Sequence, residues 1–246
     1  MKVIAVSNLK GGVGKTITAT SMSYLLGVEK NKKVLVVDAD QQANSTRTFG
    51  RFDPEGTGIM QLLEGENQIT NLIQDTPYEN IHILPSNMYL VRTNAHLMFS
   101  KDNQIDHLKE ALEEIRRNYD YVICDCGLIL DMTVLNVMMA ADLLIIPVKA
   151  GGYGIEGAEN LQEQIQEIRP DLDTKILMTM KAGNKINRDT EEWMKQNYGN
   201  RMFQTAIRRS VVVEKAETAF MPLPEFSKRS NPVKDYKEVI KEIIKK

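Results

Sequence analysis

The chain has 246 residues, of which 42% are hydrophobic and 26% charged, and its net charge is −2. These values are ordinary for a globular protein of one α/β domain, and no repeat, low-complexity tract or linker divides the chain, so we expect a single domain over residues 1–246. No apolar stretch approaches the roughly 18 residues of a membrane span. The chain starts at its first predicted strand, so we expect neither a signal peptide nor an N-terminal helix-turn-helix domain. Two cysteines, Cys124 and Cys126, are too few and too close for a disulfide framework, which favours a reducing cytoplasm.

Short β-branched runs alternate with amphipathic segments of helical length, which predicts an α/β fold with a mostly parallel, twisted sheet flanked by helices. The predicted strands are Val3–Ser7, Lys33–Val37, Ile81–Leu84, Tyr121–Cys124, Leu143–Val148, Lys175–Met180 and a short piece at Phe203–Ile207. The predicted helices are Thr18–Val28, a short one starting at Met60–Leu63, Gln104–Asn118, Thr133–Ala140, Gly157–Ile168, Arg188–Tyr198 and Pro232–Lys245.

The segment between the first strand and the first helix is glycine-rich and reads Leu9-Lys10-Gly11-Gly12-Val13-Gly14-Lys15-Thr16. A strand, a glycine-rich turn and a helix N-terminus form the context of a phosphate-binding loop, in which backbone amides and the helix dipole hold phosphate oxygens. Lys15 would reach the β- and γ-phosphates, and the Thr16 hydroxyl would bind Mg²⁺. The usual pattern has glycine at the position of Leu9, and this loop contains a second lysine, Lys10.

The string KGGVGKT at Lys10–Thr16 resembles the deviant phosphate loop of the ParA/MinD family of partition and positioning ATPases. The resemblance covers nearly the whole chain and implies a P-loop NTPase fold with ATP and Mg²⁺ as cofactors. It also implies that Lys10 crosses an ATP-bridged dimer interface and neutralises charge on the phosphoryl group of the partner's nucleotide. The nucleotide-binding residues that it implies are Lys10, Gly11, Gly12, Val13, Gly14, Lys15, Thr16 and Ile17, with Met180 and Arg208 near the adenine.

Carboxylates follow the second predicted strand, at the end where parallel sheets bind ligands. Asp38 and Asp40 alternate along an extended chain, so we expect both to project from one side. The segment is similar to the family's Asp-x-Asp-Pro-Gln-Gly-Asn, with Gln41 for proline and Ala43 for glycine. The resemblance implies that Asp40 orients the attacking water and that Asp38 organises the magnesium shell. The catalytic residues are then Lys10, Lys15 and Asp40.

The strand Tyr121–Asp125 resembles the family's Walker B strand, which implies that Asp125 holds Mg²⁺ through water, together with Thr16 and Asp38. Relatives continue with two prolines, whereas this chain reads Cys126-Gly127-Leu128-Ile129, and Gly127 loosens a segment that prolines would stiffen. We expect Cys124 and Cys126 to be small buried hydrophobic residues, because no further cysteine completes a metal or iron–sulfur site.

Positive charge accumulates near the C-terminus, where residues 181–246 carry 15 Lys and Arg against nine Asp and Glu, so the rest of the chain carries −8. This excess is compatible with a surface that faces a polyanion, although a purely solvated basic face would give the same count. Ile207–Val211 resembles a family segment whose surroundings grip DNA without sequence preference, although Val212 replaces an arginine common in relatives. The candidate DNA contacts are Lys181, Lys185, Arg188, Arg208, Arg209 and Lys215.

The last predicted helix carries an apolar stripe with lysines opposite it. The stripe consists of Val233, Tyr236, Val239, Ile240, Ile243 and Ile244. MinD-like relatives use such a helix to lie on membranes, but this stripe lacks the Phe and Trp that favour the interface, so we expect core packing.

The sequence therefore indicates a cytoplasmic, nucleoid-associated, Mg²⁺-dependent ATPase of the ParA type. The resemblance implies an ATP-dependent homodimer, nonspecific DNA binding and a ParB-like partner, in the segregation of a plasmid, chromosome or mobile element. The alternatives are a MinD-like membrane-associated positioning ATPase and an interaction module with an inactive loop.

Overall fold

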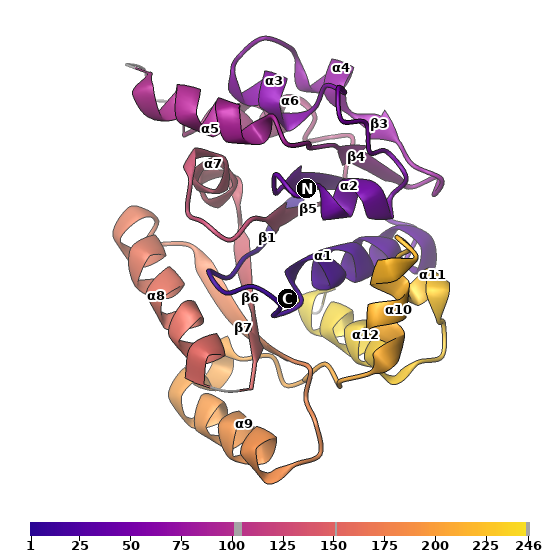
Figure 1. Ribbon diagram of the computed structural model, residues 1–246, viewed down its shortest axis with the longest axis vertical. Helices are drawn as coiled ribbons and strands as arrows, with labels where there is room; N and C mark the ends of the chain where they lie inside the picture. The colour runs from indigo at the N-terminus through magenta and orange to yellow at the C-terminus, as the bar shows by residue number, and fades with distance from the viewer. Residues whose placement is uncertain (101–104, 151, 245–246) are drawn as a thin grey trace.

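The computed structural model describes residues 1–100, 105–150 and 152–244 (Figure 1). Within them, a seven-stranded sheet has the order β3-β4-β2-β5-β1-β6-β7. Every neighbouring pair is parallel except β3 and β4, which are antiparallel, so the predicted mostly parallel sheet is confirmed. The strands are β1 Lys2–Val6, β2 Val34–Ala39, β3 Gln74–Asp75, β4 Ile81–Leu84, β5 Tyr121–Cys126, β6 Leu143–Lys149 and β7 Asp173–Thr179.

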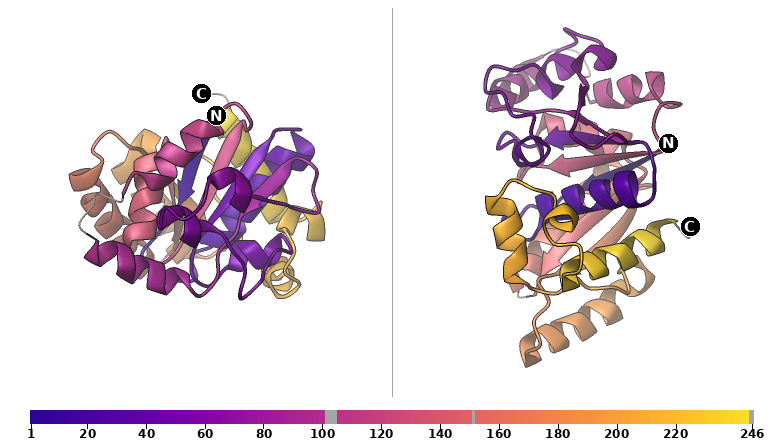
Figure 2. Two further views of the ribbon diagram at one scale, coloured as in Figure 1. Left: turned by 90° about the horizontal axis from the view of Figure 1, so that it is seen from above. Right: turned by 90° about the vertical axis from the view of Figure 1, so that its right-hand side faces the viewer.

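Helices cover both faces of the sheet, with α7 and α8 on one side and α1 and α12 on the other (Figures 1 and 2). Alternate side chains of each strand enter different cores: Val3 and Ala5 pack with the α7 and α8 side, and Ile4 and Val6 with the α1 and α12 side. The helices are α1 Lys15–Tyr24, a π-helical turn η1 Leu25–Glu29, α2 Asn44–Thr48, α3 Ile59–Leu63, α4 Ile69–Leu72, α5 Leu90–Phe99, α6 His107–Glu114, α7 Met132–Ala140, α8 Gly152–Ile168, α9 Lys185–Tyr198, a 3₁₀ turn η2 Gly199–Arg201, α10 Val211–Thr218, α11 Leu223–Phe226 and α12 Asn231–Ile244.

The predicted strand at Phe203–Ile207 is wrong. Phe203 and Ile207 donate backbone hydrogen bonds to β7, but the residues between them leave the sheet. The reason is the Glu242 carboxylate of α12, which accepts the backbone N–H groups of Gln204 and Thr205 at 3.0 Å each. The Glu242 carboxylate of the C-terminal helix therefore binds two backbone N–H groups that would otherwise be available to an eighth strand.

The C-terminal helix confirms the expectation of core packing. Val233, Tyr236, Val239, Ile240 and Ile243 are buried against α1 and the sheet. None of the described helices is both long enough and apolar enough to cross a membrane. The ends of two predicted helices, at residues 104 and 245, lie outside the described residues.

Candidate functional site

The predicted phosphate loop, Leu9–Thr16, joins the carboxyl end of β1 to α1 and includes the first two residues of that helix. Gly12 and Gly14 have φ of +67° and +89°, a backbone region that glycine enters without steric cost. Because α1 begins at Lys15, directly after Gly14, the unpaired amides and the positive dipole end of this helix lie at the loop. This is the arrangement that binds phosphate in other proteins.

The loop is held from two neighbouring strands. The buried Asn8 side chain donates to the carbonyl of Pro147 on β6 at 2.8 Å and accepts the Lys10 N–H at 2.9 Å. From β7, the Thr179 hydroxyl donates to the carbonyl of Val13 at 2.8 Å. These contacts fix the loop before any ligand arrives. Sequence reasoning missed Asn8, although a polar residue between a buried strand and a glycine-rich loop is a usable signal.

Lys15 lies almost fully buried beneath this loop, with an exposed fraction of 8%. Its Nζ donates to the carbonyl of Lys10 at 3.3 Å, which is a long contact for a buried ammonium group. Burial lowers the pKa of Lys15, and the nearby charges of Asp125 and Asp40 oppose that shift. The site thus contains a desolvated cation that a phosphate group would satisfy.

Asp38 and Asp125 are register partners on the neighbouring strands β2 and β5. Both carboxylates are buried, with exposed fractions of 0% and 1%. Burial raises the pKa of each group, and the proximity of Asp125 raises that of Asp38 further. The Ser45 hydroxyl is the main group that lowers the pKa of Asp125. Two carboxylates buried side by side favour a bound cation, and within the described residues Lys15 acts on Asp125 as a nearby positive charge.

The donor set fits Mg²⁺. Asp125 Oδ1 is buried without a hydrogen-bond partner among the described residues, whereas its Oδ2 accepts from Ser45. An orphaned carboxylate oxygen beside a second carboxylate suits a hard, hydrated cation, which keeps several waters and prefers oxygen ligands. The half-buried Thr16 lies in the first turn of α1 and also acts to lower the pKa of Asp125. Thr16, Asp38 and Asp125, the predicted metal set, therefore come together here.

Asp40 lies just beyond β2 and is half-buried. Its Oδ1 accepts the Gln42 N–H at 2.9 Å, and its N–H donates to Asp38 Oδ1 at 3.2 Å. A Cβ atom on Gly127 would lie 3.8 Å from the Asp40 carboxyl carbon. Gly127 therefore borders the residue that was predicted to orient water.

The segment Cys126–Ile129, which lacks the two prolines of the family pattern, also borders the phosphate loop. A Cβ atom on Gly11 would lie 3.8 Å from a methyl group of Leu128. Leu128 and Ile129 are 48% and 67% exposed. The segment after β5 thus borders both Asp40 and the loop, and it presents the apolar side chains of Leu128 and Ile129 at the surface.

Ala43 occupies the position at which the family pattern has glycine, and the backbone explains that pattern. Ala43 has φ +53°, in the left-handed region, and it immediately precedes α2. A non-glycine residue in this region costs roughly 1–2 kcal/mol. The chain accepts this cost to start α2 directly beneath the two buried carboxylates.

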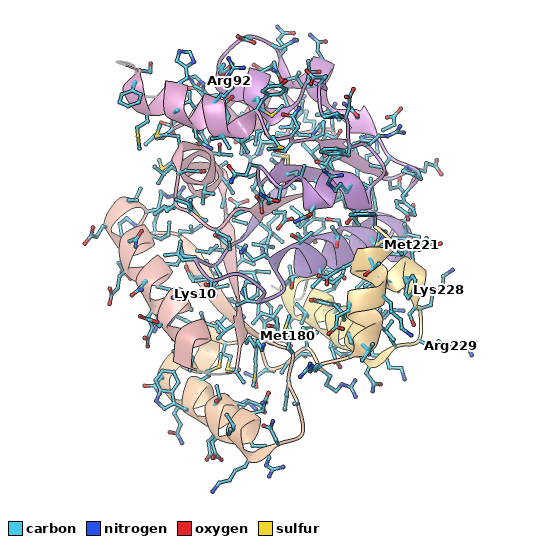
Figure 3. All side chains as sticks on the ribbon, in the orientation of Figure 1. Lys10, Arg92, Met180, Met221, Lys228 and Arg229 are labelled. Carbon is cyan, nitrogen blue, oxygen red and sulfur yellow. The ribbon has the colours of Figure 1, made fainter. Side chains whose placement is uncertain are left out.

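Lys10 lies on the side of the loop that faces α8 (Figure 3). Its Nζ is 3.7 Å from Glu156 Oε2, and both side chains are substantially exposed. The close approach of Lys10 to helix α8 needs glycine at position 157, because a Cβ atom there would come within 2.4 Å of Lys10 Cγ. Lys10 is therefore accessible at the mouth of the site, while Lys15 is buried inside it.

A pocket of about 150 Å³ opens beside Gly14 and the start of α1. Met180 and Arg208, both predicted beside the base, line it together with Ile17. Arg208 is fixed there because its guanidinium binds the Asp235 carboxylate, with Nη2 to Oδ1 at 2.6 Å and Nε to Oδ2 at 2.9 Å. The pocket adjoins the phosphate loop, which is the position that the base of a nucleotide requires.

Comparison with known proteins agrees with this geometry. The AAA domain family model matches residues 1–178. Over 250 residues the chain is 30% identical to the sporulation initiation inhibitor protein Soj of Bacillus subtilis, covering 98% of both chains. The chain belongs to the ParA/MinD family of P-loop ATPases.

Solved structures similar to this ParA/MinD family member share its fold. A putative plasmid partition protein of Borrelia burgdorferi B31, bound to AMPPNP, superposes with a TM-score of 0.87 at 23% identity, covering 99% of this chain and 98% of that one. Cobyrinic acid a,c-diamide synthase from Mycobacterium smegmatis, with a bound ATP analogue and magnesium, gives a TM-score of 0.84 at 26% identity and covers 99% and 94%. The fold therefore extends over the full described chain, beyond the part that the AAA domain model matches.

The six predicted DNA contacts of this ParA/MinD family member differ in their surroundings. Lys181 Nζ is paired with Glu191 at 2.5 Å, and Arg208 is bound to Asp235. The remaining four are exposed, two of them on α9 and one on α10, and these two helices lie in different parts of the molecule in Figure 1. These four are Lys185, Arg188, Arg209 and Lys215.

The two cysteines lie as predicted for small hydrophobic residues. Cys124 and Cys126 are both fully buried in the core on the α7 and α8 side of the sheet. Burial raises the pKa of both thiols. This protonated, buried state suits packing rather than nucleophilic or redox chemistry.

Proposed function

We propose that this protein is a ParA-type, Mg²⁺-dependent ATPase that forms an ATP-bridged homodimer and binds DNA without sequence preference. A ParB-like, centromere-binding partner then stimulates hydrolysis and release during segregation of a plasmid, chromosome or mobile element. The observation that carries the ATPase proposal is the buried triad of Lys15, Asp38 and Asp125 beneath the phosphate loop, with one carboxylate oxygen left unpaired. The family membership and the names of relatives such as Soj support the partition role.

The site residues divide the chemistry between them. Loop amides and Lys15 bind the phosphates, and Thr16, Asp38 and Asp125 would hold Mg²⁺, which neutralises charge on the β- and γ-phosphates when bound. Asp40 orients the attacking water from its position beside Gly127. Because the chemistry of phosphoryl transfer depends mainly on positioning and charge, these groups supply the part of the site that one protomer contributes.

Lys10 supplies the dimer link. An accessible lysine at the mouth of the site can reach a second subunit's nucleotide, where it would act like an arginine finger in trans. Contacts to the γ-phosphate then favour the dimer, and loss of that phosphate favours monomers, as a shift between two populations. Five of the six residues of the apolar stripe of α12 pack into the core and only Ile244 is exposed, at 43%, which argues against a membrane role for this helix.

Substitution of Asp40 tests the proposal. We expect Asp40→Ala to bind ATP with Mg²⁺, to hydrolyse it at least about 100-fold more slowly, and to accumulate as a dimer that light scattering detects. Asp53→Ala, which removes an exposed aspartate remote from the loop, should leave turnover unchanged. A rapidly hydrolysing Asp40→Ala protein would contradict the assignment.

DNA and membrane roles separate in a paired assay. With ATP and Mg²⁺, the wild-type protein should shift random-sequence duplex DNA in a gel, and the shift should disappear without nucleotide. It should not sediment with anionic liposomes under either condition. ATP-dependent liposome binding without a DNA shift would replace the ParA-type proposal with the MinD-like one.

A further inference from the structure

Two adjacent hydroxyl side chains, those of Ser45 and Thr46, donate hydrogen bonds to the two buried carboxylates. The Thr46 hydroxyl and the Thr46 backbone N–H both donate to Asp38 Oδ2, at 2.7 Å each. The Ser45 hydroxyl donates to Asp125 Oδ2 at 2.8 Å. Both residues belong to the short helix α2, and both are completely buried.

These hydrogen bonds decide which carboxylate oxygens remain available. On Asp125, Ser45 occupies Oδ2 and leaves Oδ1 without a partner among the described residues. On Asp38, Thr46 occupies Oδ2 twice, while Oδ1 accepts, among the described residues, the longer contact from the Asp40 N–H at 3.2 Å. Each carboxylate thus has one firmly bound oxygen and one weakly bound or free oxygen.

The position of Thr46 is itself fixed from a third direction. Its hydroxyl oxygen accepts the backbone N–H of Ser86 at 3.0 Å, just after strand β4. The left-handed backbone of Ala43 starts α2 at the correct place. A side chain that donates to Asp38 and accepts from the neighbouring strand end has little rotational freedom, so its orientation of Asp38 is rigid.

We infer that Thr46 and Ser45 are positioning residues for the Mg²⁺ site, an inference that rests on the proposed ATPase function. They act as a hydroxyl clamp that holds the two buried carboxylates in the correct orientation before the cation arrives. Hydrogen bonds to charged groups are stronger than neutral ones, and partners that orient the ligands of a metal typically change its affinity 10- to 100-fold. The clamp therefore lowers the Mg²⁺ concentration needed for tight nucleotide binding.

The test measures Mg²⁺ dependence directly instead of turnover. The affinity of full-length protein for AMPPNP is measured by calorimetry over a range of Mg²⁺ concentrations and once in EDTA. The variants are Thr46→Val, which removes the hydroxyl at similar volume, and Ser45→Ala. Thr48→Val is the matched control, because the Thr48 hydroxyl lies in the same helix and donates only to the Asn44 carbonyl.

We expect Thr46→Val and Ser45→Ala each to raise the Mg²⁺ concentration at half-maximal affinity by roughly tenfold. Affinity in EDTA should stay at the wild-type value, since Lys15 and the loop amides are untouched. Thr46→Ser should restore most of the Mg²⁺ dependence, because serine can donate to Asp38 from the same position. Thr48→Val should resemble wild type throughout.

A folded Thr46→Val protein with the wild-type Mg²⁺ midpoint would overturn the clamp. If Thr46→Val does not fold, Ser45→Ala decides the matter by the same criterion. A purely structural role would lower the melting temperature without moving the Mg²⁺ midpoint, and that result also counts against the clamp. If wild-type protein itself shows no Mg²⁺-dependent AMPPNP binding, the failure belongs to the proposed function.

Discussion

The buried charged groups beside the phosphate loop differ from two charged side chains of the C-terminal quarter in burial and in ion pairing. At the loop, Lys15 and the Asp38–Asp125 pair are buried, and no ion pair among the described residues neutralises them at short range. In the C-terminal quarter, Lys181 and Arg208 lie closer to the surface and have their own carboxylate partners. A buried charge without a close partner indicates a ligand, whereas Lys181 and Arg208 each already have a structural partner.

The largest effect should come from the buried cation. Lys15→Ala removes the ammonium group that reaches the phosphates, so we expect ATP affinity to fall by at least about 100-fold, equivalent to about 2.7 kcal/mol. Calorimetry with AMPPNP and Mg²⁺ measures it. The exposed Lys30 supplies the control, because Lys30→Ala removes an equal charge outside the site. Equal affinity in wild type and Lys15→Ala would refute the assignment of Lys15.

A smaller effect should appear in the stability of the ligand-free protein. Asp38→Asn removes one of two buried like charges, so in EDTA we expect the melting temperature to rise by about 2–4 °C, or about 1 kcal/mol. The folded-state pKa of Asp38 is raised, so its charge destabilises the fold at neutral pH, and this penalty disappears as the pH falls toward the ordinary range for Asp. The difference between variant and wild type should therefore close in acid.

The control for this prediction is Asp53→Asn, which changes an exposed aspartate and should not move the melting temperature. A lower melting temperature for Asp38→Asn at neutral pH would show that its hydrogen bonds to Thr46 outweigh the repulsion from Asp125. Scanning calorimetry at several pH values measures both outcomes.

The sequence predicted the sheet and the nucleotide site because both depend on local patterns. The phosphate loop is a contiguous string, and Asp38 and Asp125 each follow a short apolar run that the sequence marks as a strand. Parallel strands then bring these ends together at one edge of the sheet. The site could thus be assembled from three separate segments without knowledge of side-chain packing.

What the sequence could not predict depends on contacts between distant residues. Helix α5 buries Leu90, Thr93 and Leu97, but its exposed Val91 and Phe99 hide that face from a periodicity argument. Helix α2 is only five residues long and is anchored by the buried carboxylates, so no propensity reveals it. The ion pairs Lys181–Glu191 and Arg208–Asp235 are also invisible in the sequence, because each joins two elements and depends on how they pack.

The smallest effect compares two adjacent arginines, Arg208 and Arg209. Both side chains are exposed, but the Arg208 guanidinium is held in two-point contact by Asp235, whereas no ion pair is seen for Arg209 within the described ranges. Arg209→Gln should weaken ATP-dependent binding to random-sequence duplex by roughly threefold to tenfold and reduce the slope of log affinity against log salt by about 0.9, the change for one phosphate contact. Arg208→Gln should lower the melting temperature and leave that slope unchanged, because a guanidinium already bound to a carboxylate releases few DNA counterions. Fluorescence anisotropy across a salt series measures both slopes. If Arg208→Gln changes the slope as much as Arg209→Gln does, the Asp235 pair opens on DNA, and the contrast between the two regions fails at this residue.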